Sequence, residues 1–134
     1  MAVVLVINDD SDLLDAYESA LLSLGHEPVT KVTMASGPET IRDVGADALV
    51  VDLQRPNEND YGLRIIEELR SDPQMRSFPV ILCSGAVDVV RSLRPRLDEL
   101  GVPVVVKPFS IHDFEQTLEA VLGEGRPDEP TESA

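Results

Sequence analysis

Cysteine and aromatic residues are scarce in this chain, and long apolar runs are missing. Cys83 is the single cysteine among 134 residues, which excludes an internal disulfide and is compatible with a reducing cytoplasm. Because no cluster of Cys and His accompanies it, Cys83 is expected to be a small core residue. The apolar run Ala2 to Ile7 is too short for a signal peptide and lacks a basic flank. No run reaches the length of a membrane span, so a cytoplasmic protein is expected.

Basic residues are also few, at 11 against 25 acidic residues, and the formal net charge is −14. Such a surface repels nucleic-acid backbones, so direct nucleic-acid binding is not expected. It favours cations or basic protein surfaces as partners. Part of the acidity lies in residues 123–134, which have no apolar periodicity. We expect a folded domain over residues 1–122 and a disordered acidic tail over residues 123–134.

Apolar runs alternate with segments of helical periodicity, without an internal repeat or a second domain. Strands are expected at residues 3–7, 28–32, 48–52, 78–84 and 102–107. Helices are expected at residues 11–25, 36–44, around 63–69, 88–100 and 110–121. This alternation implies an α/β fold, a five-stranded parallel doubly wound sheet with five helices covering both faces.

Side chains that can cap a helix mark three of the helix starts. They are Ser11, the pair Ser36 and Glu39, and the pair Ser110 and Asp113. Within the fourth helix, Pro95 is expected to start a turn or a kink, because proline has no backbone N–H to donate.

Polar side chains stand at the ends of four of the expected strands. They are Asn8, Asp9 and Asp10 after the first strand, Asp52 after the third, Ser84 after the fourth and Lys107 after the fifth. Each has an ordinary explanation as a helix-capping, turn or loop residue. Ligands of doubly wound sheets bind beyond the carboxyl ends of the strands, however, so these side chains are expected to meet in one crevice.

The chemistry that fits such a crevice is phosphoryl transfer to a carboxylate. Neighbouring carboxylates would hold a divalent cation, with Mg²⁺ the usual choice, and the cation would neutralise the incoming phosphoryl group. Asp52 would be the nucleophile. Lys107 would pair with Asp52 before transfer and contact the phosphoryl oxygens afterwards, and the Ser84 hydroxyl could donate to a phosphoryl oxygen.

The chain resembles the receiver domains of bacterial two-component response regulators, a CheY-like, flavodoxin-like fold. The resemblance covers residues 3–122 and is carried by the spacings between Asp9, Asp52, Ser84 and Lys107 and by the segment Lys107-Pro108-Phe109. It implies that Asp52 is the phosphoacceptor, Ser84 the switch hydroxyl and Lys107 the invariant lysine. It further implies an Mg²⁺ site made by Asp9, Asp52 and the backbone carbonyl of Gln54, and a cis peptide bond at Lys107–Pro108.

Several residues depart from the family pattern. Asn8 takes the place of the first acid, which removes a negative charge and should weaken Mg²⁺ binding; Asn8 and Asp10 are expected to contribute to the outer shell of the metal. Arg55 brings a cation close to the site entrance. Val104 replaces the aromatic switch residue, and a valine cannot swing between buried and exposed positions as a tyrosine does.

The leading hypothesis is a receiver that accepts a phosphoryl group on Asp52 from a sensor histidine kinase or a phosphotransfer protein. Its output would be contact with another protein through the fourth helix, fifth strand and fifth helix, as a stand-alone monomer or weak homodimer or as a piece of a longer hybrid protein. The alternative is a degenerate receiver that binds proteins independently of phosphorylation, which Asn8 and Val104 favour. An enzyme is not expected, because Gln54 stands where an aspartate-based phosphatase would need a general acid. Five aromatic residues and the lack of a phosphate loop argue against a flavin protein.

Overall fold

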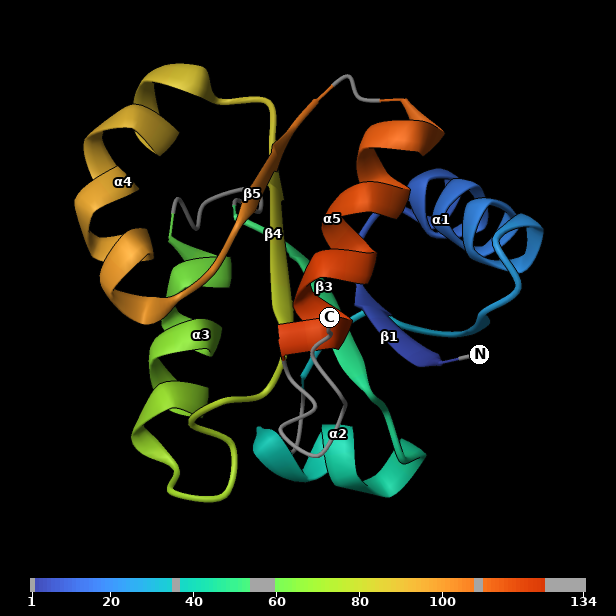
Figure 1. Ribbon diagram of the computed structural model, residues 1–134, viewed down its shortest axis with the longest axis horizontal. Coiled ribbons are helices and arrows are strands. Elements are labelled where there is room, and N and C mark those ends of the chain that lie inside the picture. The colour runs from blue at the N-terminus through green and yellow to red at the C-terminus, as the bar shows by residue number, and fades with distance from the viewer. Residues whose placement is uncertain (1, 35–36, 54–59, 108–109, 125–134) are drawn as a thin grey trace, which may run out of the picture.

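The fold is a single parallel sheet with helices on both faces (Figure 1). The computed structural model describes residues 2–34, 37–53, 60–107 and 110–124. The strands are β1 (Val3–Ile7), β2 (Glu27–Lys31), β3 (Ala48–Asp52), β4 (Val80–Ser84) and β5 (Val104–Val106). The helices are α1 (Ser11–Ser23), α2 (Pro38–Val44), α3 (Tyr61–Ser71), α4 (Val87–Leu100) and α5 (Ile111–Glu124).

The strands pair in the order β2-β1-β3-β4-β5, and every pair is parallel. The chain leaves β1 toward one edge of the sheet and returns to the other side of β1 with β3. The carboxyl ends of β1 and β3 therefore flank the point at which the strand order reverses, where ligands bind in such sheets. The doubly wound α/β architecture expected from the sequence is confirmed.

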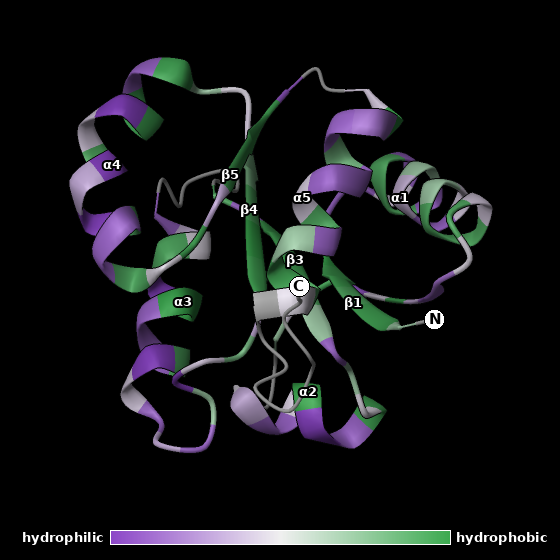
Figure 2. Cartoon of the chain, in the orientation of Figure 1, coloured by the Kyte–Doolittle hydropathy of each residue, from purple (hydrophilic) through white to green (hydrophobic). Residues whose placement is uncertain are grey.

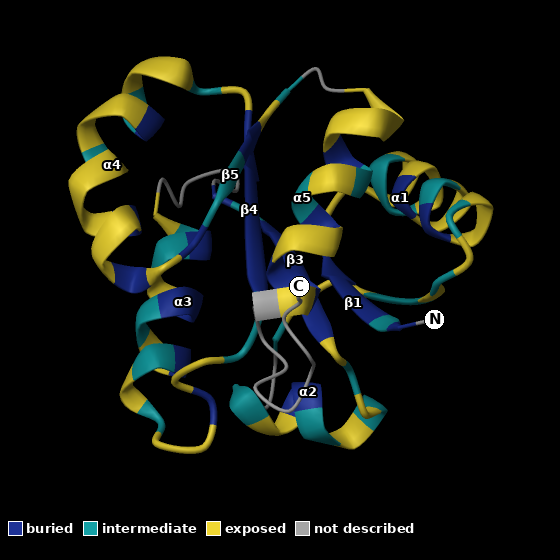
Figure 3. Cartoon of the chain, in the orientation of Figure 1, coloured by how far each residue is buried: buried dark blue, intermediate teal, exposed yellow. Residues whose placement is uncertain are grey.

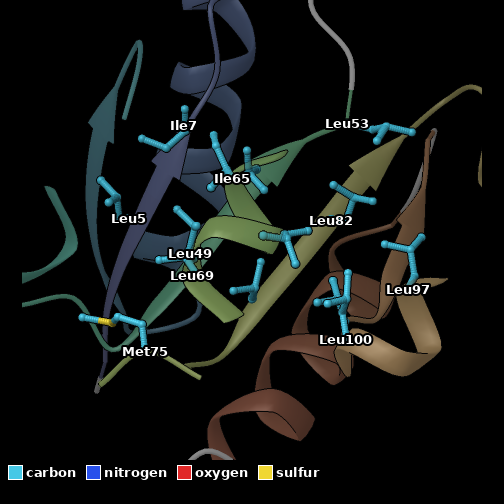
Figure 4. Close-up of a cluster of buried hydrophobic side chains, with 14 of the residues drawn as sticks. Leu5, Ile7, Leu49, Leu53, Ile65, Leu69, Met75, Leu82, Leu97 and Leu100 are labelled. Carbon is cyan, nitrogen blue, oxygen red and sulfur yellow. The ribbon is translucent and has the colours of Figure 1, made fainter. Parts of the chain in front are cut away.

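An apolar core lies on each face of the sheet. On one face, buried residues of α2, α3 and α4 pack on the sheet. Ile65, Leu69 and Leu97 are among those drawn in Figure 4. On the other face, α1 and α5 cover the strands with Tyr17 and Phe114. The central strands are apolar along their length and are buried, as strands covered on both faces must be (Figures 2 and 3).

Helix capping follows the prediction in one place and departs from it in another. The Ser110 hydroxyl accepts the backbone N–H of Asp113 at 3.1 Å, as predicted. Helix α1, by contrast, is capped by Asp10, whose carboxylate accepts the N–H groups of Asp12 and Leu13. Asp10 has the extended backbone of an N-cap, so Ser11 becomes the first helical residue instead. The capping role predicted for Ser36 lies outside the described residues.

Pro95 does not end or break α4, contrary to the turn expected there. The helix runs from Val87 to Leu100 through the proline, which is on the exposed face. There, water can satisfy the carbonyl oxygen of Arg91 that proline leaves without a helical donor. Helix α5 continues to Glu124, and the remaining residues of the expected tail lie outside the described part of the chain. None of the described helices is long and apolar enough to cross a membrane.

Arg70 fastens the amino-terminal end of the sheet. Its half-buried guanidinium on α3 donates to the backbone carbonyl of Leu100 at 2.7 Å, at the end of α4. It also donates to the carbonyl of Phe78 at 3.0 Å, just before β4. Burial lowers the pKa of this guanidinium, which nevertheless stays charged because an arginine ionises far above neutral pH. This contact ties α3, α4 and the entry to β4 together, opposite the carboxyl ends of the strands.

Candidate functional site

The predicted site residues lie along one edge of the sheet, at or just beyond the carboxyl ends of adjacent strands. Asp52 ends β3 and Ser84 ends β4, while Asn8 directly follows β1 and Lys107 directly follows β5. Because β1, β3, β4 and β5 are consecutive in the sheet, their carboxyl ends form a continuous rim. The hydrogen bonds of Asp52 show how these side chains meet.

Lys107 and Asn8 both donate to the same carboxylate oxygen of Asp52. The Nζ of Lys107 lies 2.7 Å from Oδ2 of Asp52, and the Nδ2 of Asn8 lies 2.6 Å from it. The side chains of Lys107 and Asp52 are 26% and 17% exposed, so water screens this ion pair less than it screens a surface pair. The prediction that Lys107 pairs with Asp52 is confirmed.

The other carboxylate oxygen of Asp52 is buried and lacks a protein partner. Oδ1 has no hydrogen-bond partner within the part of the chain that the structure describes. A buried carboxylate oxygen without a partner carries a desolvation cost, and such atoms occur where a ligand or an ion completes the site. Oδ1 is therefore the atom of the site that is available to a phosphoryl group or a cation.

Asn8 is held at both ends of its amide. The side chain is buried, and its Oδ1 accepts the backbone N–H of Asp10 at 2.8 Å. Since that N–H can only donate, the contact fixes the amide orientation and turns the NH₂ group toward Asp52. Asn8 therefore contacts the Asp52 carboxylate directly.

The two acids after Asn8 have different surroundings. Asp9 is exposed, and its carboxylate is free of the capping role that occupies Asp10. One oxygen of the Asp10 carboxylate, Oδ1, accepts the N–H groups of Asp12 and Leu13 at the start of α1. Gln54 and Arg55 lie outside the described residues, as does the peptide bond expected to be cis at Lys107–Pro108.

A magnesium site is compatible with these donors. Asp52 Oδ1 and Asp9 offer carboxylate oxygens, which are the ligands that Mg²⁺ prefers, and Mg²⁺ commonly keeps several waters and few protein ligands. Among the described residues there is no cluster of three or more Asp, Glu, His or Cys side chains placed to hold a metal. The donor set therefore fits a weak site rather than a closed one.

Ser84 joins the site to the loop that follows β4. Its side chain is buried, and its Oγ accepts the backbone N–H of Ala86 at 3.0 Å. Its backbone carbonyl accepts the N–H of Lys107 at 2.9 Å. A movement of Ser84 would therefore displace both Lys107 and the residues that begin α4. Val104, at the aromatic switch position, packs against the core on the α4 side.

Gly62 is a site residue that sequence reasoning missed. A β-carbon at this position would lie 2.5 Å from the backbone oxygen of Asp52 and 2.8 Å from Leu82. Its N–H also donates to the carbonyl of Leu53 at 2.9 Å. The backbone of α3 therefore approaches the end of β3 more closely than a side chain would permit. No local sequence pattern signals this close approach, because it is set by the backbone of Asp52.

Behind the rim, Cys83 and Tyr17 are buried in the core under α1 and α5. Burial raises the pKa of the Cys83 thiol to about 12, so the thiol stays protonated at neutral pH. This confirms Cys83 as a core residue. Burial, followed by the proximity of Cys83, raises the pKa of the Tyr17 hydroxyl, and its ring packs on Phe114 with centroids 5.8 Å apart. The negative charge of Asp52 also contributes to raising both pKa values.

A groove of about 810 Å³ runs between α1 and α5 and reaches the rim at Lys107. Its lining is mainly apolar or small, and includes Leu13, Ala16, Ala20, Ile111 and Phe114. The side chain of Ile111 is 52% exposed in this groove. The groove is continuous with the site because Lys107 belongs to both.

Comparison with known proteins places this geometry among signalling domains. The chain is 33% identical over 84% of its length to the hybrid signal transduction histidine kinase D of Dictyostelium discoideum, of which it spans 7%. It is 24% identical over 91% of its length to a chemotaxis protein CheY homolog of Campylobacter jejuni, of which it spans 93%. No protein-family model matches the chain.

The fold is shared with a solved receiver domain. The receiver domain of sensor histidine kinase PA1611 from Pseudomonas aeruginosa, solved with a magnesium ion coordinated in its active-site cleft, superposes with a TM-score of 0.74. The identity is 20%, and the alignment covers 91% of this chain and 98% of that one. Together with the curated relatives, it confirms the family resemblance drawn from the sequence.

Proposed function

The chain is a CheY-like receiver domain of two-component systems, and we propose that it accepts a phosphoryl group on Asp52. The observation that carries the proposal is the state of the Asp52 carboxylate. One oxygen is held by Lys107 and Asn8, and the other is buried without a partner. A carboxylate fixed in orientation, with one oxygen left for bond formation, is arranged for nucleophilic attack.

The proposed reaction moves a phosphoryl group from a phosphohistidine to Asp52. Oδ1 of Asp52 forms the new bond to phosphorus while the P–N bond breaks, and the histidine nitrogen keeps the electron pair of that bond. The product is an acyl phosphate. Lys107 contacts the new phosphoryl oxygens and remains a charge-assisted donor, and Ser84 donates its hydroxyl proton to one of them.

Magnesium would be held by Asp9, Asp52 and the backbone carbonyl of Gln54. When bound, it supplies positive charge that offsets the charge of the phosphoryl group. The residues of the chain orient Asp52 and bind the phosphoryl oxygens.

The phosphodonor is a sensor histidine kinase or a phosphotransfer protein, and its helical surface docks in the groove between α1 and α5. Two features support this choice of surface: the lining of the groove is mainly apolar, and Lys107 belongs to it. The output is contact with a second protein through α4, β5 and α5, whose exposed apolar residues include Val87 and Val106. We further propose that the domain lies in the cytoplasm. We also propose that it does not catalyse a reaction on a separate substrate.

Incubation with acetyl phosphate and Mg²⁺, followed by intact-mass measurement, tests the proposal. The wild type should gain the mass of one phosphoryl group, and Asp52→Asn should not. Asp15→Asn is the matched control because Asp15 is an exposed acid on α1. A wild type without the mass gain, or Asp52→Asn with it, would refute the assignment.

A second candidate is a receiver that binds its partner without phosphorylation. Val104 favours it, because the valine packs on the core and cannot act as an aromatic switch. This candidate predicts that Asp52→Asn leaves partner binding unchanged.

A further inference from the structure

The inference concerns Asn8 and rests on the proposed function of Asp52. We propose that Asn8 is a positioning residue that takes over part of the role of the divalent cation in the unphosphorylated site. Its amide N–H holds Oδ2 of Asp52, so the carboxylate is oriented with Oδ1 available whether or not a cation is bound.

The first support is the direction of the hydrogen bond. The backbone N–H of Asp10 fixes the Asn8 oxygen at 2.8 Å, so the amide nitrogen must face Asp52. The resulting contact to Oδ2 measures 2.6 Å, a short hydrogen bond to a charged acceptor. Asn8 is 2% exposed, so water competes little for this bond.

The second support comes from asking what an acid would do in this position. A carboxylate at position 8 would face Oδ2 of Asp52 at the same short range, and two ionised carboxylates at that distance repel each other. The ammonium of Lys107 would offset part of this repulsion, and a proton or a second cation would have to offset the rest. With asparagine the two groups attract each other, and the cation is not needed to hold them together.

The third support is that the two carboxylate oxygens of Asp52 differ in their hydrogen-bond partners. Lys107 and Asn8 occupy Oδ2, whereas Oδ1 has no partner among the described residues. The carboxylate is therefore oriented by the protein alone. A cation at Oδ1 would meet a site with one fewer negative charge than the family pattern supplies. Cation affinity decreases when a site has fewer charged ligands.

The experiment compares the wild type with Asn8→Asp, Asn8→Ala and Ser11→Asp. Ser11→Asp is the charge-matched control, since Ser11 is exposed and its side chain plays no part in the site. The first readout is Mg²⁺ binding without any phosphodonor, by calorimetry and by backbone amide shifts. The second is the rate of phosphorylation by acetyl phosphate with Mg²⁺ and with a chelator.

Asn8→Asp should bind Mg²⁺ at least about tenfold more tightly than the wild type, because it adds a charge next to Asp52. Ser11→Asp should stay within about twofold of the wild type, because exposed charges are screened. Asn8→Ala should bind Mg²⁺ like the wild type, because it adds no charge. In chelator, the wild type should keep a measurable phosphorylation rate that both Asn8 variants lose.

Two results would overturn the inference. One is Mg²⁺ affinity of Asn8→Asp no higher than that of Ser11→Asp, and the other is an Asn8→Ala rate in chelator equal to that of the wild type. If none of the proteins is phosphorylated under any condition, the proposed function fails. An Mg²⁺ affinity of Asn8→Asp no higher than that of Ser11→Asp would then still overturn the inference on Asn8.

Discussion

The Nζ atom of Lys107 lies 2.7 Å from Oδ2 of Asp52, although 55 residues separate the two in the sequence. The pair spans β4, because Asp52 ends β3 and Lys107 follows β5. The backbone of Ser84, at the end of that intervening strand, accepts the N–H of Lys107. Asp52, Lys107 and Ser84 are therefore connected by hydrogen bonds.

Ser84→Ala tests whether Ser84 carries the signal out of the site. The variant should still be phosphorylated on Asp52, but residues 85–95 should no longer change their hydrogen exchange on phosphorylation. The contact of a hydroxyl with a charged phosphoryl group contributes about 1.5–3 kcal/mol, enough to shift two balanced states by tenfold or more. A full exchange response in Ser84→Ala would show that the signal leaves by another route.

Gly62→Ala tests the close approach of α3 to β3. The added β-carbon would lie 2.5 Å from the Asp52 oxygen, so the free energy of unfolding should fall by about 1–3 kcal/mol in urea denaturation. Gly123→Ala is the matched control, since a β-carbon there meets nothing within 4 Å. In helix α5 it should raise the stability by about 0.5–1 kcal/mol. Equal effects of the two substitutions would contradict the close packing at Gly62.

Ile111→Asp tests the groove as the docking surface of the phosphodonor protein. The substitution places a charge in the apolar lining and should slow phosphoryl transfer from a kinase or phosphotransfer protein by about tenfold or more. Phosphorylation by acetyl phosphate should be unchanged, because the small donor needs no docking surface.

Leu22→Asp is the matched control for the groove. Leu22 is 59% exposed on α1, compared with 52% for Ile111 on α5, and it is not among the groove residues. Its variant should receive the phosphoryl group from the protein donor at the wild-type rate. If both variants are slowed alike, the effect is one of surface charge in general.

The buried thiol of Cys83 and the buried hydroxyl of Tyr17 predict that the protein loses stability in alkaline solution. Burial raises the pKa of the Cys83 thiol from 9.0 to about 12 and raises that of the Tyr17 hydroxyl as well. As the pH rises above about 9, the unfolded chain releases these protons first and therefore binds fewer protons than the native protein. Their contribution to stability is thus complete below pH 9 and is lost progressively as the pH approaches 12.

Urea denaturation at increasing pH measures this slope. Cys83→Ala and Tyr17→Phe each remove one ionising group, so each variant should lose stability less steeply than the wild type above about pH 9. Slopes identical to that of the wild type would show that neither buried group is linked to the alkaline transition.

The strand pattern was predictable because its physical signal is local. Apolar runs such as those of β3 and β4 are buried on both faces, and each ends on the polar residue that the site uses, Asp52 or Ser84. The pairing of Lys107 with Asp52 followed from the topology alone, since neighbouring parallel strands end at the same edge.

The parts that sequence reasoning missed depend on contacts between distant segments. The need for glycine at position 62 is set by the backbone of Asp52, which no local pattern reveals. The direction of the Asn8 amide is set by the N–H of Asp10 and by the carboxylate of Asp52. The start of α1 was misplaced by one residue, because Asp10 and Ser11 are both good caps and only the backbone conformation distinguishes them.

The guanidinium of Arg70 holds one end of α4 in place. At the fixed end, the last turn of α4 and the entry to β4 share one cation through the carbonyls of Leu100 and Phe78. At the other end, α4 begins beside Ser84, whose Oγ accepts the N–H of Ala86. We therefore expect a displacement that starts at Ser84 to move the first turn of α4 the most, because Arg70 holds the last turn at Leu100.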